Sequence, residues 1–265
     1  MKAIDRIIED LQLQDIKRLG ERLNKEILIT KPLSNNSNLE YLYDKDGKLI
    51  YKRKIKNSNE EFRYTYKYDE NKIYVSYKGY NYKNQLDLYT SDIISINNYL
   101  KDNEQIEVIN NYKYDRKTDR RFAYKTSCEY KKISGLNILL LIDSSDIYNK
   151  NNNELIVQRL LQLNKVDILN ININNKTMRL NYSYPDMKAI VTINIINDKI
   201  VSMKCESDNA PDKHKVSIKY DKDGFLREVK EIIMTHLNWE YTTTTTYDYK
   251  NMMIVEERSR AKKVK

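Results

Sequence analysis

Apolar and polar residues alternate along this chain with two different periods. Over the first 26 residues the apolar positions recur every three to four residues, as one face of a helix requires. These positions are Ile4, Ile7, Ile8, Leu11, Ile16, Leu19 and Leu23. The spacing breaks near Gln14 and Asp15, and an aspartate at such a break is suited to cap a helix. The pattern predicts two short helices, or one kinked helix, over residues 2–26, before the period changes to two at "ILIT" (27–30).

Five later segments share one arrangement: alternating residues, a Tyr-Asp pair, two to four polar residues, and alternation again. They are "YLYDKDGKLIYKR" (41–53), "YKYDENKIYVSYK" (66–78), "YKYDRKTDRRFAYK" (112–125), "IKYDKDGFLREVK" (218–230) and "TYDYKNMMIVEER" (246–258). An aspartate after a strand hydrogen-bonds the following backbone and starts a turn, and Gly47 and Gly224 supply the positive φ of a tight hairpin. Further hairpins are expected to turn at Asn174–Asn175 and Asn197–Asp198.

The predicted fold is therefore mainly β (α+β), with antiparallel twisted sheets built from β-hairpins. Two stretches interrupt the strands. "SDIISINNYL" (91–100) could form a short helix capped by Ser91 or Asp92, and a helix is expected near 153–164, with apolar residues on one side. The Asn-rich loop before that second helix is the best boundary. It gives a helical segment over 1–28, a first hairpin region over 29–150, and a helix with a second hairpin region and a basic tail over 151–265, unless these form one continuous domain.

These hairpins resemble the YD or Rhs-type repeats and, more distantly, the MORN-type repeats of bacterial toxin and toxin-neutralising loci. The residues that carry the resemblance are Tyr43–Asp44 to Gly47, Tyr68–Asp69, Tyr114–Asp115, and Tyr220–Asp221 to Gly224. The resemblance implies a curved antiparallel sheet of a kind often used for binding.

Composition bounds the compartment and the partners. The net charge is +9, from 47 Lys and Arg against 38 Asp and Glu, so the surface attracts nucleic acid, anionic lipid or an acidic protein. The most basic stretches are "YKRKIK" (51–56), "DRKTDRR" (115–121) and "RSRAKKVK" (258–265). The two scattered cysteines, Cys128 and Cys205, suit a reducing compartment. No signal peptide or membrane span is recognisable, so a cytoplasmic protein is expected.

The usual catalytic motifs are absent from the sequence. The five glycines form no phosphate-binding loop, and two lone histidines, His214 and His236, cannot supply a three-histidine zinc site. We therefore expect no metal, no nucleotide cofactor and no catalytic residue. His236 is interpreted as a strand residue.

Carboxylates leave one enzyme alternative open. Asp143 ends the apolar stretch "ILLLI", and Asp143, Ser144 and Asp146 are interpreted as a turn with a helix cap. A metal-dependent nuclease is the remaining alternative, because carboxylates such as Asp143 or Asp186, with a nearby D-x-K, can hold Mg²⁺.

Tyrosines interleaved with Lys and Arg form the remaining constellation, most densely in "RYTYKYDENKIYVSYK" (63–78). Such residues are typical of three kinds of surface: a platform for single-stranded RNA, a protein interface with Tyr and Arg anchors, and a Tyr-rich sheet face that lysines keep soluble. The sequence does not separate the three. The candidate binding residues are Tyr64, Tyr66, Tyr74, Arg53, Arg120 and Arg121.

The functional hypothesis is a non-enzymatic cytosolic binding protein that inhibits or neutralises a partner protein. Immunity proteins, antitoxins and phage anti-defence or anti-CRISPR proteins are of this kind. The basic charge favours a partner with an acidic face, or one that already carries nucleic acid. The alternative is a protein that binds RNA or single-stranded nucleic acid directly through a basic, Tyr-rich sheet face.

Overall fold

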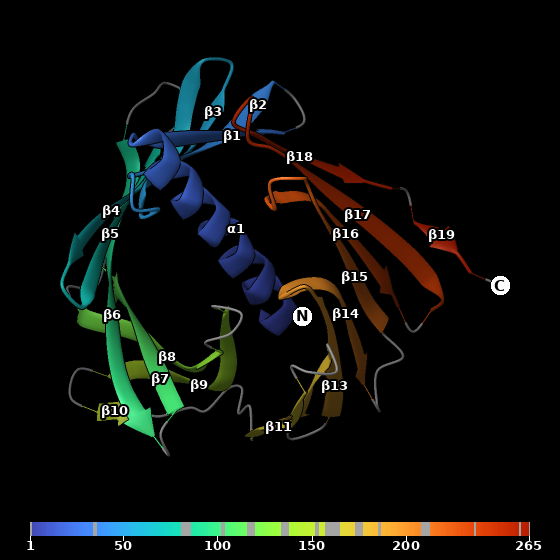
Figure 1. Cartoon of the computed structure of the whole chain (residues 1–265). Coiled ribbons are helices and arrows are strands. Elements are labelled where there is room, and N and C mark those ends of the chain that lie inside the picture. Colours follow the sequence, from blue (N-terminus) through green and yellow to red (C-terminus); the bar gives the residue numbers. More distant parts are fainter. Residues whose placement is uncertain are drawn as a thin grey trace. The chain divides into compact units, whose positions relative to one another are not determined.

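A computed structural model of the chain describes most of its backbone. The described residues are 2–33, 36–80, 86–101, 104–115, 120–133, 138–151, 154–156, 165–172, 177–184, 187–207, 213–235, 237–259 and 261–264. They form one helix and nineteen strands, which confirms the prediction of a mainly β protein with an N-terminal helix (Figure 1).

The helix α1 spans Lys2–Leu23 and is continuous. The strands are β1 Ile27–Leu33, β2 Ser37–Tyr43, β3 Leu49–Lys56, β4 Asn59–Asp69, β5 Lys72–Tyr80, β6 Leu86–Lys101, β7 Glu104–Asp115, β8 Arg120–Ile133, β9 Ile138–Asn151, β10 Glu154–Ile156, β11 Lys165–Asn172, β12 Thr177–Tyr184, β13 Met187–Ile196, β14 Lys199–Ser207, β15 Lys213–Tyr220, β16 Leu226–Met234, β17 Trp239–Asp248, β18 Met253–Arg258 and β19 Lys262–Lys263. The predicted break in the helix is wrong. Neither Gly nor Pro stands at Gln14–Asp15, and the Asp15 carboxylate binds a strand residue instead of capping a second helix.

The chain divides into two compact units. Unit 1 comprises residues 1–15, 133–143 and 162–265, and unit 2 comprises residues 16–132 and 144–161. The division expected from the sequence, into segments 1–28, 29–150 and 151–265, stays a prediction.

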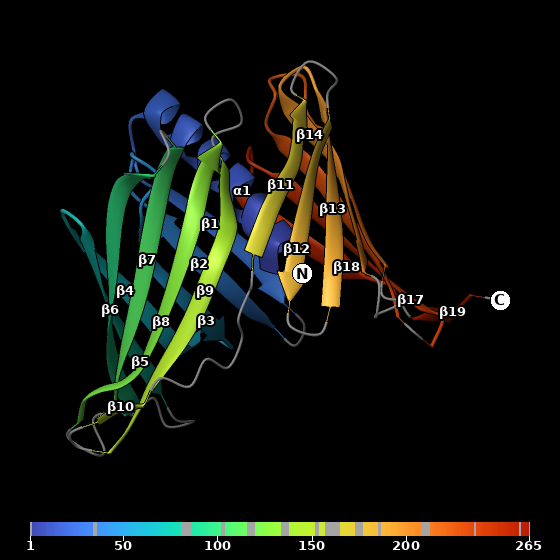
Figure 2. The same ribbon diagram turned by 90° about the horizontal axis from the view of Figure 1, so that it is seen from below.

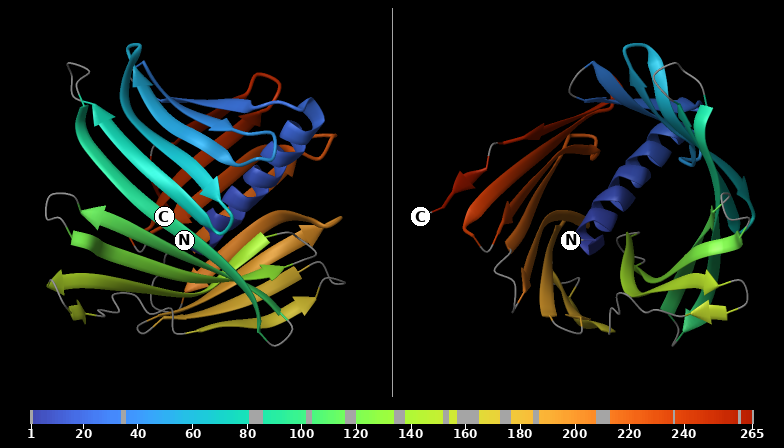
Figure 3. Two further views of the ribbon diagram at one scale, coloured as in Figure 1. Left: turned by 90° about the vertical axis from the view of Figure 1, so that its left-hand side faces the viewer. Right: turned by 180° about the vertical axis from the view of Figure 1, so that it is seen from behind.

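In unit 2, β1 to β8 pair in chain order as an antiparallel meander, and the blue-to-cyan strands in the left view of Figure 3 show its first part. In unit 1, β11 to β18 also pair in chain order, and the short β19 pairs with β17. Figure 2 shows β11 to β14 side by side.

Three local predictions are wrong. Residues 91–100 lie within the strand β6, which pairs with β5 on one side and β7 on the other. Residues 154–156 form β10 rather than a helix, and 157–164 lie outside the described residues. Asp143 is not a turn, because β9 continues through it to Asn151. In the first two cases isoleucines and leucines that fit a helical spacing also fit a strand, and pairing with neighbouring strands decides between the two.

The Tyr-Asp turns are confirmed where the structure describes them. Asp44 Oδ1 accepts hydrogen bonds from the backbone N–H groups of Asp46 (2.9 Å) and Lys48 (2.8 Å). Asp221 repeats this geometry with Asp223 and Phe225, both at 2.9 Å. Gly47 and Gly224 have φ values of +79° and +82°, the left-handed region in which glycine avoids strain.

Other predicted turns have mixed outcomes. Asn197 and Asp198 both have positive φ between β13 and β14, which confirms the turn expected there. The turn expected at Asn174–Asn175 lies outside the described residues, although β11 and β12 on either side of it do pair.

In unit 2 the first Tyr-Asp turn packs against α1. A Cβ placed on Gly20 of the helix would lie 2.5 Å from the carbonyl oxygen of Lys45 in that turn. A Cβ on Gly47 would lie 2.9 Å from the Cβ of Lys17. Only glycine at both positions allows helix and turn to approach so closely. Among the residues of this unit whose side chains are described, the buried apolar ones are Ile16, Leu19, Ile27, Ile29, Tyr43 and Val75.

In unit 1 the second Tyr-Asp turn is also fixed to α1. The backbone N–H of Leu226, at the end of the turn, donates to Asp15 Oδ2 at 2.6 Å in a buried setting. Around it, Ile4 and Ile7 of the helix are buried, together with one face of the strands: Val191, Ile193, Met203, Val216, Ile218, Leu226 and Val229. In each unit, therefore, α1 contacts a hairpin that carries a copy of "YDKDG": at the turn itself in unit 2, and at Leu226, two residues after the turn glycine, in unit 1.

Alkaline pH is expected to destabilise unit 1 through Tyr247. Burial, and then the negative charges of Glu231 and Asp15, raise the pKa of this phenol above its ordinary value. A raised folded-state pKa gives a stability contribution that is complete below the unfolded pKa of about 10 and is lost as pH rises towards the folded pKa. Between these two pKa values the free energy of unfolding falls by an amount that approaches about 1.4 kcal/mol per pH unit. Urea unfolding from pH 9 to 11 should show a shallower decline in Tyr247→Phe than in wild type; equal slopes would contradict the assignment.

Candidate functional site

The residues predicted to bind are placed on two opposite faces of the β3–β5 sheet. Residues directly opposite each other on paired strands point to the same face. Tyr66 is opposite Val75, which is buried, so Tyr64 and Tyr66 lie on the buried face. Tyr74 is opposite Lys67 and lies on the other face, with 40% of its surface exposed. The four described candidates therefore do not form one platform.

Tyr64 packs within an aromatic cluster. Its ring centroid is 4.7 Å from that of Tyr77 and 5.8 Å from that of Phe62, in tilted and edge-on arrangements. Phe62 and Tyr77 complete the cluster at 6.2 Å. Aromatic pairs at these separations stabilise a sheet face, so Tyr64 serves packing.

Arg53 lies on the face of Tyr74, where carboxylates hold it. Its Nη2 is 2.7 Å from Glu40 Oε2, its Nε donates to the same oxygen at 2.8 Å, and its Nη1 is 3.6 Å from Glu60. Arg63, directly opposite Arg53, has its Nη2 2.6 Å from Glu60. Both guanidinium groups lie 5.2 Å from the ring centroid of Tyr51. This is an internally neutralised cluster, which we call the Arg53 cluster: Arg53, Arg63, Glu40, Glu60 and Tyr51.

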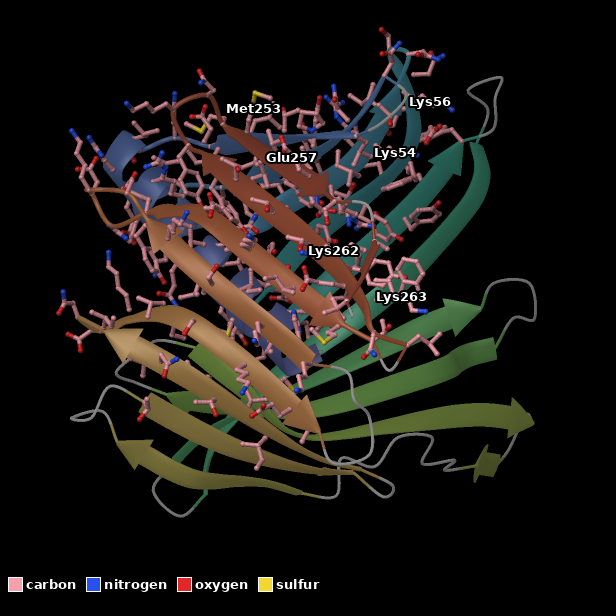
Figure 4. All side chains as sticks on the ribbon, turned by 90° about the vertical axis from the view of Figure 1, so that its right-hand side faces the viewer. Lys54, Lys56, Met253, Glu257, Lys262 and Lys263 are labelled. Carbon is pink, nitrogen blue, oxygen red and sulfur yellow. The ribbon has the colours of Figure 1, made fainter. Side chains whose placement is uncertain are left out.

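The pKa of Arg53 reflects this pairing. Partial burial acts to lower it, but the hydrogen bond and charge of Glu40 outweigh burial, so the pKa is raised overall. Lysines of the same strand are paired as well: Lys54 Nζ is 2.6 Å from Glu61, and Lys56 Nζ is 3.9 Å from it (Figure 4). Arg120 and Arg121 begin β8, and their side chains lie outside the described part of the chain.

An exposed aromatic surface that sequence reasoning missed lies at the turn between β16 and β17. Leu237 is 61% exposed, Trp239 37% and Tyr241 46%. Trp239 and Tyr241 point to the same face of β17, because they are two residues apart. Lys263 of β19 is opposite Trp239 and joins that face. We call Leu237, Trp239, Tyr241 and Lys263 the Trp239 patch.

The signal that could have located this patch was present in the sequence. The chain has a single tryptophan, and it stands in a predicted strand two residues from a tyrosine. Its exposure could not be read from the sequence, because Tyr247 lies on the same face of the same strand and is buried. His236 lies outside the described residues, so its interpretation as a strand residue stays a prediction.

A polar pair is buried inside unit 1. His214 Nε2 lies 3.1 Å from Glu231 Oε2, and His214 is only 5% exposed. Burial and the charge of Glu231 raise the pKa of Asp5 nearby. Cys205 is opposite His214 across β14 and β15, and burial, followed by the charge of Glu206, raises the pKa of its thiol. A thiol with a raised pKa is held in its unreactive protonated form, so this arrangement does not activate a nucleophile.

The carboxylates considered for a nuclease lie where the structure describes no side chains, so that alternative stays a prediction. Asp143 lies within β9, and Asp186 lies outside the described residues. Across the part of the chain where side chains are described, no three His, Cys, Asp or Glu side chains gather closely enough to hold a metal ion. Within the same limits, no helix has the length and apolar character to cross a membrane.

Comparison with known proteins identifies no family. No family model matches the chain, and no curated protein matches it. The resemblance to YD, Rhs and MORN repeats therefore stays a prediction. Among solved structures, the chain is similar to a porin-like protein from Bacteroides uniformis, with 9% sequence identity and a TM-score of 0.32 over 88% of this chain and 95% of that one. A TM-score of that size carries no argument about fold or function.

Proposed function

We propose that this chain is a non-enzymatic binding protein whose ligand is another protein, which it inhibits or neutralises. The Arg53 cluster is the observation that carries the choice of a protein ligand. A single-strand platform needs cations free to contact phosphates and aromatic rings free to stack on bases. Here Glu40 and Glu60 already neutralise Arg53 and Arg63, and the Tyr64 ring is packed against Tyr77 and Phe62.

The exposed aromatic residues support the same proposal. Tyr74 and the Trp239 patch present Tyr and Trp side chains from paired strands. Such residues supply much of the binding energy in protein interfaces, because they bury large areas while losing little conformational freedom. The rest of the surface around them would then act mainly as a polar rim.

The inhibitory role rests on the hairpins. Their Tyr-Asp turns resemble, in sequence, those of toxin-neutralising loci. Two of these turns, at Asp44 and Asp221, have the same hydrogen bonds as each other. Inhibitors of the immunity, antitoxin or phage anti-defence kind act by covering a surface of their target, which requires no chemistry of their own.

Direct binding of single-stranded RNA is the second candidate, favoured by the β4–β5 hairpin. Lys67, Lys72 and Lys78 are exposed there, and Lys67 is directly opposite the exposed Tyr74. This cluster is a small footprint of three lysines around one ring. It predicts weak binding with a shallow salt dependence.

Fluorescence anisotropy with labelled single-stranded RNA at about 50 and 200 mM salt separates the two candidates. We expect weak binding by the wild type. A variant with Glu40→Gln and Glu60→Gln frees two arginines, and should bind more tightly at low salt, with a log–log salt slope steeper by about 0.7 for each freed arginine.

The matched control is Glu26→Gln with Glu257→Gln, which removes the same charge from two exposed positions that are not members of the Arg53 cluster. This control should gain less RNA affinity at low salt than the variant with Glu40→Gln and Glu60→Gln. Tight binding by the wild type at 50 mM that collapses at 200 mM would contradict the proposed function and establish the RNA candidate.

A further inference from the structure

The placement of the Trp239 patch beside the basic end of the chain points to a specific ligand. We propose that this patch is a docking site for an acidic segment of the partner protein that carries a large apolar side chain. The inference rests on the proposed function, because it names the chemistry of the partner that the chain would bind. Figure 4 shows Lys262 and Lys263 on β19, which pairs with the first two residues of β17, Trp239 and Glu240.

The first argument is that hydrogen bonds hold the patch in place. Thr235 N–H donates to the Trp239 carbonyl at 2.9 Å, and Asn238 N–H donates to the Thr235 carbonyl at 3.0 Å. Val264 N–H donates to the Asn238 carbonyl at 2.8 Å, which fastens β19 to the same turn. A surface fixed before binding loses less conformational entropy when its ligand arrives. The turn therefore presents Leu237 and Trp239 on a preorganised backbone.

The second argument is that the patch lies on the same face of β17 as a core residue, beyond the buried part of the strand. Tyr247, on the same face of β17, is buried, whereas Tyr241 and Trp239 towards the start of the strand are exposed. Leu237 in the adjoining turn is the most exposed of the large apolar residues whose side chains are described. Contiguous exposed apolar residues rimmed by charge mark interaction sites, since leaving them in water is unfavourable. They fit an aliphatic or aromatic side chain.

The third argument is charge. Residues 258–265 hold three lysines and two arginines and no acid, and pairing of β19 with β17 places Lys262 and Lys263 of this segment opposite Glu240 and Trp239. Glu240, the residue next to Trp239 in the chain, is already paired with Lys262 at 2.8 Å. Within the described residues, Lys263 has no carboxylate partner. An acidic ligand would be attracted to this edge, and a basic one repelled.

Charge and side-chain type also weigh against two other occupants. A second copy of the chain carries the same net charge of +9 and the same basic end, so the two copies would repel each other. Single-stranded nucleic acid would stack on Trp239 and Tyr241, but it has no use for the aliphatic Leu237. The combination of Leu, Trp, Tyr and Lys is that of a protein anchor site.

The test uses a random dodecapeptide display library as the probe and the purified full chain as the target. We expect enriched peptides to combine Asp or Glu with at least one large apolar residue. The same selection is run on a variant with Trp239→Ala and Tyr241→Ala, checked by circular dichroism, and should lose those sequences. Enrichment of basic or uncharged peptides, equal enrichment on the variant, or no enrichment would overturn the proposal.

Trp239 also supplies the affinity readout, because it is the only tryptophan in the chain. A synthesised copy of an enriched peptide should change the emission of Trp239 when it binds. Lys263→Glu should weaken this binding by about two- to fivefold, as expected for a partly exposed charge. Tyr241→Ala, which keeps the fluorophore, should weaken it by about 30-fold if Tyr241 is an anchor. Binding unchanged in both variants would overturn the site.

Two further outcomes assign the patch elsewhere and overturn the proposal. The first is that single-stranded RNA binds more tightly than the peptide at physiological salt, as measured by the change in Trp239 emission. The second is a dimer by light scattering that Trp239→Ala with Tyr241→Ala dissociates. A protein partner captured equally by the wild type and by this double variant would also overturn the site, while leaving the proposed function standing.

Discussion

Replacing Gly20 with alanine is expected to lower the free energy of unfolding by about 1–2 kcal/mol. The added Cβ would lie 2.5 Å from the Lys45 carbonyl oxygen and 3.0 Å from its carbonyl carbon. These are backbone atoms of a turn closed by its own hydrogen bonds, so they cannot move aside as a flexible side chain would. Overpacking of this kind costs about 1–3 kcal/mol. It opposes the gain of up to about 1 kcal/mol that alanine brings to a helix.

Urea unfolding of Gly20→Ala beside Glu21→Ala measures this effect. Glu21 is the next helix residue and is exposed, with only a 3.9 Å contact to Lys17, so its substitution should change stability by less than about 0.5 kcal/mol. Stabilisation by Gly20→Ala would mean that helix propensity decides, and that the turn does not pack closely against α1.

Replacing Asp15 with alanine is expected to cost about 2–3 kcal/mol. Its carboxylate accepts the 2.6 Å hydrogen bond from the Leu226 backbone, and a buried N–H without an acceptor retains the full cost of its desolvation. Asp15→Asn keeps an acceptor oxygen and should lose less stability. Equal losses in the two variants would show that the hydrogen bond is not the source of the effect.

The same substitution has a spectroscopic consequence that tests the contact independently. Burial, followed by the negative charge of Asp15, raises the pKa of Tyr220. Removing that charge in Asp15→Asn should lower the pKa of Tyr220. In a titration followed by ultraviolet absorbance, one tyrosine should then ionise at a lower pH in the variant than in the wild type. An unchanged titration would place Asp15 away from Tyr220.

Turns were predictable from the sequence because their chemistry is local. Asp44 and Asp221 bond backbone groups two and four residues away, so the residues that decide the turn stand next to each other in the sequence. What the sequence did not show is why the motif occurs twice. Each copy contacts α1, through Gly20 and Lys45 in one unit and through Asp15 and Leu226 in the other. These contacts join residues far apart in the chain.

The placement of the candidate binding residues was only partly predictable. Alternation within β4 correctly separates neighbouring residues onto two faces, but whether Tyr64 and Tyr74 share a face depends on the register across the β4–β5 turn. With Asp69 opposite Lys72, Tyr66 comes opposite Val75, and Tyr74 is turned to the other side. Carboxylates from β2 and β4 then neutralise Arg53, which composition cannot reveal.

The Trp239 patch was missed for a different reason. A tryptophan within an alternating strand is usually assigned to a core, and the strand pattern around it is regular. Its exposure follows from where the buried part of β17 ends, between the buried Tyr247 and the exposed Tyr241. That limit is set by tertiary packing, which no local pattern encodes.

Affinity capture of the tagged full chain from the organism that encodes it tests the central claim most directly. The capture is made after nuclease treatment, at physiological salt. We predict that one protein co-purifies in stoichiometric amount, survives the nuclease, and loses its own activity when the purified chain is added back. Recovery of nucleic acid in place of a protein, or of a stoichiometric protein whose activity the chain leaves unchanged, would contradict the account.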